Sequence, residues 1–315
     1  MGKGESPNRK PVALIAGPTA SGKSAIALRL ASARLANGLQ TVIINADSMQ
    51  VYRDIPVLAA TPDTDEQSQC PHKLYGAWDG AQACSAADWA VRAKQEIAKA
   101  HNTGALPVLV GGTGMYMKVL LEGIAPIPDI DPEIREQVRA MDTADAYIAL
   151  ESEDPERAAL LEPTDSQRIA RALEVMRSTG QPLNHWQERK TGGIEGQIGL
   201  HPLILLPNRD WLYERCDRRF ESMLESGAID EVRNLLDRGL DHKLPVMRAI
   251  GVPEIVALVK GELSRAEAIT AGQQSTRNYA KRQYTWFRRQ PPKSWPRAES
   301  INNDVELYFA SLLQS

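Results

Sequence analysis

A glycine-rich loop near the start of the chain has the residue types needed to hold a phosphate chain. It matches G-x-x-x-x-G-K-S in full and consists of Gly17, Pro18, Thr19, Ala20, Ser21, Gly22, Lys23 and Ser24. Backbone N–H groups of such a loop, and of the helix after it, converge on phosphate oxygens. Lys23 adds a positive charge, and the Ser24 hydroxyl is suited to bind Mg²⁺. The pattern therefore predicts a phosphate site assisted by magnesium.

A carboxylate and a second glycine turn follow two other apolar runs. Asp47 comes directly after residues 41–46, and Thr113 lies in the turn that follows residues 106–110. Because ligands of parallel sheets bind at the carboxyl ends of the strands, both side chains are expected beside the phosphate loop. Asp47 suits a metal ligand, a helix N-cap or a general base, and we favour the base. Thr113 suits phosphate contact, helix capping or both.

Basic residues gather in two later segments. Arg215, Arg218 and Arg219 are spaced to share one helix face, which suits either a developing oxyanion or a solvated surface. Residues 277–297 hold seven bases and no acid, interleaved with aromatic residues. Cations that bind phosphates beside rings that stack bases are typical of nucleic-acid surfaces. Residues 126–165 instead hold twelve acids and three bases, which we interpret as a solvated face.

The elements that position these residues alternate between strand and helix. Apolar runs at 12–16, 41–46 and 106–110 predict strands, and residues 24–37 and 86–101 predict helices. This alternation predicts an α/β fold with a parallel sheet flanked by helices. Residues 125–198 are predicted to form a helical insertion domain, bounded by prolines and glycines. The catalytic core would then comprise 1–124 and 199–315, with a strand at 201–206 and helix from 210 to about 287.

Composition places few further constraints on the partners. The net charge of −3 indicates no general affinity for nucleic acid, and no apolar run approaches the roughly 20 residues of a membrane span. Three scattered cysteines suit a reducing cytoplasm, without a disulfide framework. Residues 1–6 fit the loose myristoylation pattern, but no second membrane signal accompanies them, so we interpret them as a disordered leader. We expect neither membrane association nor an obligate protein partner.

Several blocks in order make the chain resemble the bacterial tRNA dimethylallyltransferases. They read GPTASGKS (17–24), INADSMQVYR (44–53), GGTGMYMKVLLEG (111–123), QRIARALEV (167–175), RCDRRFESMLESGAIDEV (215–232), MRAIGVPE (247–254) and RNYAKRQYTWFR (277–288). The resemblance extends from about residue 11 to residue 288.

This resemblance implies an enzyme that transfers the dimethylallyl group of dimethylallyl diphosphate to N6 of adenosine 37, with Mg²⁺. Its substrates would be tRNAs that read codons beginning with U. Thr19, Lys23, Ser24 and Arg219 would hold the diphosphate, and Asp47 would take the N6 proton. The insertion would help to close over the anticodon stem-loop. The implied tRNA contacts are Asp47, Ser48, Met49, Gln50, Thr113, Arg135, Gln167, Arg168, Ile169, Ala170, Arg171, residues 248–253 including Arg248, Lys281, Arg282, Gln283, Trp286 and Arg288.

One segment departs from the family pattern, and three alternatives remain. Thr61 stands where the family usually has lysine, within residues 54–62. A transferase acting on free AMP, ADP or ATP would share the loop and the base, although it would not need the insertion or the basic end. A small-molecule kinase would share the loop, but the strand at 106–110 lacks the acidic residue expected at its end. A non-catalytic RNA-binding protein is the third alternative.

Overall fold

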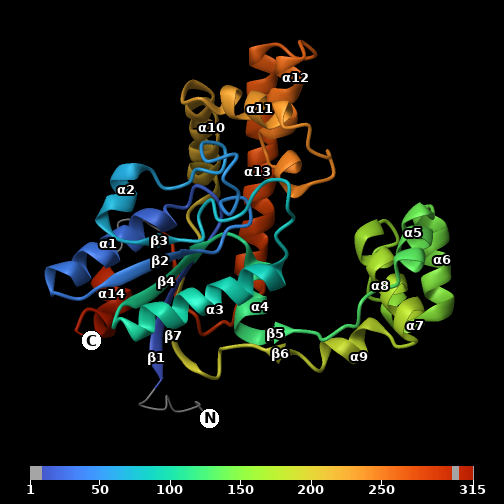
Figure 1. The fold of residues 1–315 in the computed structure, drawn as a ribbon, viewed down its shortest axis with the longest axis horizontal. Coiled ribbons are helices and arrows are strands. Elements are labelled where there is room, and N and C mark those ends of the chain that lie inside the picture. Colours follow the sequence, from blue (N-terminus) through green and yellow to red (C-terminus); the bar gives the residue numbers. More distant parts are fainter. Residues whose placement is uncertain (1–8, 300–304, 315) are drawn as a thin grey trace. The chain divides into compact units, whose positions relative to one another are not determined.

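The fold was determined as a computed structural model that describes residues 9–299 and 305–314; the leader predicted at residues 1–6 lies outside them. Its main sheet is parallel, with the strand order β3-β2-β4-β1-β7-β8 (Figure 1). The strands are β1 (Lys10–Ala16), β2 (Thr41–Asn45), β3 (His72–Lys73), β4 (Leu106–Gly111), β7 (Ile198–Leu205) and β8 (Arg297–Ala298). The predicted α/β class and parallel sheet are therefore confirmed.

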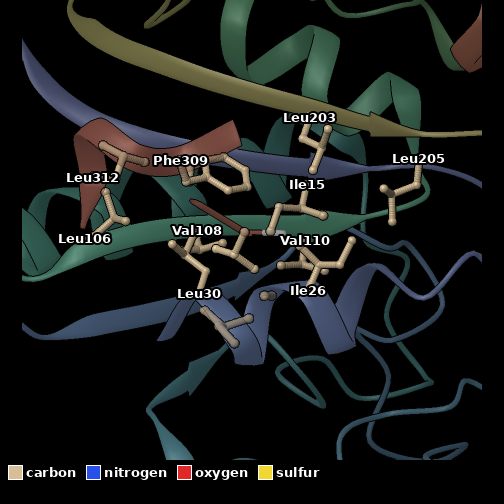
Figure 2. Close-up of a cluster of buried hydrophobic side chains, with 14 of the residues drawn as sticks. Ile15, Ile26, Leu30, Leu106, Val108, Val110, Leu203, Leu205, Phe309 and Leu312 are labelled. Carbon is tan, nitrogen blue, oxygen red and sulfur yellow. The ribbon is translucent and has the colours of Figure 1, made fainter. Parts of the chain in front are cut away.

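The two faces of the sheet are covered by helices. Alternate strand residues such as Ile15 and Val108 pack against Ile26 and Leu30 of α1 (Lys23–Ala36), together with Phe309 of α14 (Val305–Phe309) (Figure 2). The intervening strand residues are also buried, because strand side chains alternate between faces. On that side α3 (Ala86–Asn102) packs on β2 and β4. This two-sided burial explains why the strands are continuously apolar.

The region after β7 is helical, as expected, but it is not one helix. It comprises α10 (Arg209–Glu225), α11 (Ala228–Asp237), the 3-10 turn η1 (Pro245–Arg248), α12 (Val252–Val259) and α13 (Arg265–Arg289). Gly227 separates α10 from α11 with φ of 103°, a conformation that residues other than glycine rarely adopt. The two longest helices of this region, α10 and α13, pack against each other.

A second compact unit spans Leu121–Ile194, while Met1–Leu120 and Glu195–Ser315 form the first. Its helices are α5 (Pro132–Ala140), α6 (Thr143–Glu153), α7 (Pro155–Ala158), α8 (Ser166–Thr179) and α9 (Leu183–Gln187). Between the prolines at 126–132 and the glycines at 192–196 the described elements are these helices, and at the boundary itself β5 (Gly123–Ile124) pairs antiparallel with β6 (Thr191–Gly192). This ladder joins the entering and leaving chain, and the compact unit begins and ends four residues earlier than the predicted 125–198.

Three further elements lie in or beside the first unit: α2 (Thr64–Gln69), α4 (Gly114–Glu122) and the C-terminal turn η2 (Ala310–Leu312). In the part of the chain that is described, none of the helices has the length and apolar character required to span a bilayer.

Candidate active site

The phosphate loop connects β1 to α1 and leaves the start of the helix open. Gly22 occupies the N-cap of α1 with φ of 89°, and no side chain among the described residues caps this end. By contrast, Ser85, Asn208 and Ser264 cap the helices α3, α10 and α13 through their side chains. The first N–H groups of α1 therefore keep their hydrogen-bonding capacity for an anion.

Three cationic side chains surround this loop. The Nζ of Lys23 donates to the carbonyl of Pro18 at 3.0 Å, and burial lowers the pKa of Lys23 to about 8. Arg219 donates to the Thr19 hydroxyl from α10. One turn earlier, the Nε of Arg215 donates to the carbonyl of Ala20 at 3.0 Å. Ala20 has a φ of 60°, so Arg215 supports a strained turn of the loop.

The predicted arginine cluster is therefore two residues rather than three. Arg215 and Arg219 bond the loop, as the oxyanion alternative requires, whereas Arg218 is exposed, as the solvated alternative requires. Residues four apart lie almost above one another on a helix, so Arg215 and Arg219 both reach the loop. A residue three positions on, such as Arg218, lies to the other side of the first residue.

Asp47 is held in position by Asn45, a buried residue that the sequence analysis did not single out. The Asn45 side chain accepts from the Asp47 N–H at 2.8 Å and donates to the Asp47 carbonyl at 3.0 Å. The Oδ1 of Asp47 accepts from the Met49 N–H at 3.0 Å. Within the described residues no protein hydrogen bond reaches Oδ2, so this oxygen is available to take a proton from a substrate.

Gln283 ties the phosphate loop to the second glycine turn. Its Oε1 accepts from the Thr19 N–H at 2.7 Å, and its Nε2 donates to the carbonyl of Gly112 at 2.8 Å. It is 5 % exposed, so its prediction as a tRNA contact was wrong: both ends of the amide are used inside the protein. The same glycine turn lies close against α13, because a Cβ at Gly112 would overlap Gln283 and one at Gly114 would overlap Trp286.

Thr113 connects this turn to the segment after β2. Its hydroxyl accepts from the Ser48 N–H at 2.9 Å and donates to the Ser48 hydroxyl at 3.2 Å. Thr113 thereby holds the backbone next to Asp47, a positioning role that the capping interpretation did not include. Burial also raises the pKa of nearby Tyr279, which keeps that phenol neutral.

Two cavities meet beside Asp47. The phosphate cradle is lined by Thr19, Lys23 and Ser24, together with Arg215 and Arg219. The apolar cavity adjoins it and has about 920 Å³ of space, its open mouth included. The larger apolar side chains of its wall are Met49, Ile55, Leu58, Cys216, Phe220, Met223 and Ile250. Four residues line both cavities: Thr19, Asp47, Ala59 and Arg219. A ligand with a charged end and an apolar end would fit across this junction.

The segment that departs from the family pattern forms a wall shared by both cavities. From α11, the Glu231 carboxylate accepts from the N–H groups of Val57 and Leu58, the latter at 3.0 Å. Gln50 donates to the carbonyls of Ala59 and Ala60, at 3.0 and 2.7 Å. Gln50 thus supports the wall and does not offer its amide nitrogen to RNA. The hydroxyl of Thr61 is buried and has no partner among the described residues.

The remaining predicted RNA contacts differ in exposure. Arg248 and Arg282 are the exposed residues of the apolar cavity's lining and so mark its mouth. The half-buried Ser48 and Met49 also line this cavity. Lys281 and Arg288 are exposed, and Trp286 is half-buried beside Phe287.

In the second unit, the exposed predicted contacts are Arg135, Gln167 and Arg168. Ile169 was wrongly predicted as a contact, because it is fully buried in the core of this unit, where Ala170 packs partly buried against it. Arg171 points toward the buried Glu174, with a separation of 3.6 Å.

Comparison with known proteins identifies the family. The family model described as IPP transferase matches residues 50–290. The chain belongs to the IPP transferase family. The resemblance expected from the sequence blocks is thereby confirmed.

Relatives of the family match this chain over nearly its whole length. A protein of Erythrobacter litoralis named tRNA dimethylallyltransferase is 61% identical over 311 residues, covering 99% of this chain and 97% of its own. One of Novosphingobium aromaticivorans with the same name is 61% identical over 277 residues, covering 88% and 99%. The crystal structure of tRNA isopentenylpyrophosphate transferase from Bacillus halodurans is 31% identical, with a TM-score of 0.67 and coverages of 97% and 95%.

A eukaryotic dimethylallyltransferase, solved as snapshots of the enzyme acting on tRNA, is 27% identical. Its TM-score is 0.72, and the match covers 88% of this chain and 69% of that one.

Proposed function

We propose that this member of the IPP transferase family transfers the dimethylallyl group from dimethylallyl diphosphate to N6 of adenosine 37. The products are N6-(dimethylallyl)adenosine in tRNAs that read codons beginning with U, and free diphosphate. Relatives that this chain matches over nearly their whole length carry the name tRNA dimethylallyltransferase. Because the three cysteines are free, we place the reaction in a reducing cytoplasm.

The observation that carries this proposal is the junction of the two cavities. The cradle offers amides and cations to a diphosphate, and the adjoining cavity offers an apolar wall to a short hydrocarbon chain. Asp47 lines both cavities, which supports a place for its carboxylate where the two ends of an allyl diphosphate would meet. The apolar part of this wall suits a hydrocarbon chain better than the polar ribose of a nucleoside triphosphate, whose hydroxyls would be poorly paired there.

The chain's residues then have distinct parts in the reaction. As the bond from the allyl carbon to the diphosphate oxygen breaks, negative charge grows on the diphosphate. Lys23, Arg219 and the amides of α1 stabilise that charge. The exocyclic N6 attacks the allyl carbon and becomes acidic as the new bond forms. Asp47 then takes the N6 proton.

The cradle also has donors suited to Mg²⁺. Ser24 is the second residue of α1, and the carboxylates of Asp47 and Glu66 line the same cavity. A hard cation that keeps several waters and binds substrate phosphates fits one protein hydroxyl with oxygen-rich surroundings. Ser24 would hold the ion, which when bound neutralises part of the diphosphate charge.

The mouth of the apolar cavity suits an extruded base. Arg248 and Arg282 are exposed there, and Arg282 lies over the ring of Tyr279 at 5.6 Å. A stacked adenosine cannot reach the cavity, so it must leave the stack at a cost of a few kcal/mol. Phosphate contacts from the arginines offset this cost, which supports an anticodon stem-loop rather than a free nucleotide as the acceptor.

Mass spectrometry of tRNA after reaction with dimethylallyl diphosphate tests the proposal. We expect the added group at position 37 of a stem-loop with A36-A37-A38, and no product from AMP. Prenylated AMP with unmodified RNA would favour the free-nucleotide transferase. Phosphoryl transfer from ATP without prenylation would favour a kinase.

A further inference from the structure

Helix α10 runs from the phosphate loop along the wall of the apolar cavity. Cys216 packs with Ala20 of the loop, while Phe220 and Met223 follow on the same face and line the cavity. Four residues of helix rise by about 6 Å, so Phe220 lies roughly one turn beyond the level of the loop. Phe220 also directly follows Arg219, which bonds the Thr19 hydroxyl of the loop. Its ring therefore lies within reach of an allyl chain that begins at the diphosphate.

The ring of Phe220 has no room to move away from the cavity. A Cβ at Gly272 of α13 would overlap the ring, and one at Gly251 would lie 3.2 Å from its Cε2. Gly251 also supports Leu58, whose Cδ2 would be 2.7 Å from the same Cβ. Glycine weakens a helix interior, so its presence at Gly272 is explained by the space that the ring occupies. Phe220 and Leu58 thus pack against the backbone of glycines, which cannot move aside by a change of rotamer as a side chain could.

The nearby hydroxyl of Thr276 does not make this part of the cavity wall polar. Thr276 lines the cavity one turn after Gly272, but its hydroxyl donates to the Gly272 carbonyl at 2.7 Å. Phe220 is itself 3 % exposed and Cys216 is fully buried. Phe220 and Leu58 are consequently fixed parts of the apolar wall, to which Met223 and Ile250 also belong.

We propose that Phe220, seated against Gly272 and Gly251 with Leu58 beside it, sets the length of the allyl chain that the enzyme accepts. Its immobile ring leaves room for a five-carbon chain and so excludes the ten-carbon geranyl diphosphate. This inference rests on the proposed function, and it concerns the choice among allylic diphosphates at the same site. A smaller side chain at either position opens the wall to the second unit.

Competition between dimethylallyl and geranyl diphosphate, with the same tRNA stem-loop as acceptor, tests this role. The wild type should discriminate against the geranyl donor by about a hundredfold or more in kcat/KM. Phe220→Leu and Leu58→Ala should each raise the geranyl-to-dimethylallyl ratio of kcat/KM by about tenfold. Phe309→Leu is the matched control, because Phe309 is fully buried in the core cluster of the sheet and lines neither cavity. The geranyl-to-dimethylallyl ratio of kcat/KM for Phe309→Leu should equal that of the wild type.

Thermal unfolding of each variant shows which of them are folded. If Phe220→Leu does not fold, Leu58→Ala decides the question from the loop side of the wall. An unchanged ratio in folded, active variants, or equal use of both donors by the wild type, overturns the role of Phe220. A wild type that transfers no dimethylallyl group overturns the proposed function itself, so the two failures are distinguishable.

Discussion

Replacement of Gln283 by leucine tests whether this residue holds the site together or contacts RNA. The substitution keeps a similar volume but removes both hydrogen bonds of the amide, to the Thr19 N–H and to the Gly112 carbonyl. A buried polar group left without a partner costs about 1–3 kcal/mol. Thr19 is half-buried, so water can replace part of the hydrogen bond that its N–H loses. We therefore expect the free energy of unfolding to fall by about 2–4 kcal/mol.

The same change should loosen the phosphate loop where the donor binds. If the loss weakens transition-state binding of the diphosphate by about 1.4–2.8 kcal/mol, kcat/KM for dimethylallyl diphosphate falls by about ten- to a hundredfold. Affinity for tRNA should change little, because Gln283 is turned away from solvent.

Urea unfolding, steady-state kinetics with varied donor and filter binding of tRNA measure the three quantities. Lys281→Ala is the control on the same helix: Lys281 is exposed, and its loss should weaken tRNA binding without altering stability. Our reasoning is refuted if Gln283→Leu retains wild-type stability and donor kinetics but binds tRNA poorly.

Three other predictions follow from the charges of the site. Asp47→Ala should retain tRNA binding but lose at least about a hundredfold in transfer rate, since general base catalysis contributes 10²–10⁴-fold; single-turnover kinetics with wild-type rates would remove Asp47 as the base. Lys23 is protonated below its pKa of about 8, so kcat/KM for the donor should be level below pH 8 and fall above it, whereas a level profile to pH 10 would contradict a catalytic cation there. Arg282→Ala should raise the Kd for tRNA more than the KM for dimethylallyl diphosphate, and equal losses for both ligands would argue against the exposed mouth as the RNA side.

Local sequence patterns were sufficient where the chemistry is local. The phosphate loop needs glycines, a lysine and a serine within eight consecutive residues, and its strand and helix are its immediate neighbours. The strands at the centre of the sheet were predictable because they are buried on both faces and are therefore continuously apolar. Thr61 was noted as a departure, but only the structure places its buried hydroxyl in the wall of the cradle.

Orientation on a helix was predicted less well. The block at 167–171 was treated as one contact surface, but a helix turns each residue by about 100°, so Ile169 faces the core while Arg168 faces solvent. Gln283 is misplaced for the same reason among basic neighbours. A polar residue in a basic segment gives no local sign that both its hydrogen-bonding ends are used internally.

The sequence alone determined the phosphate loop, the α/β class and the family blocks, because each depends on neighbouring residues. Only tertiary structure decided that Gln283 bonds Thr19 across 264 positions, that Asn45 orients Asp47, and that Phe220 rests on Gly272. The apolar cavity likewise joins side chains from separate segments of the chain. Its shape depends on how those segments pack, and packing between distant residues leaves no pattern in the order of the residues.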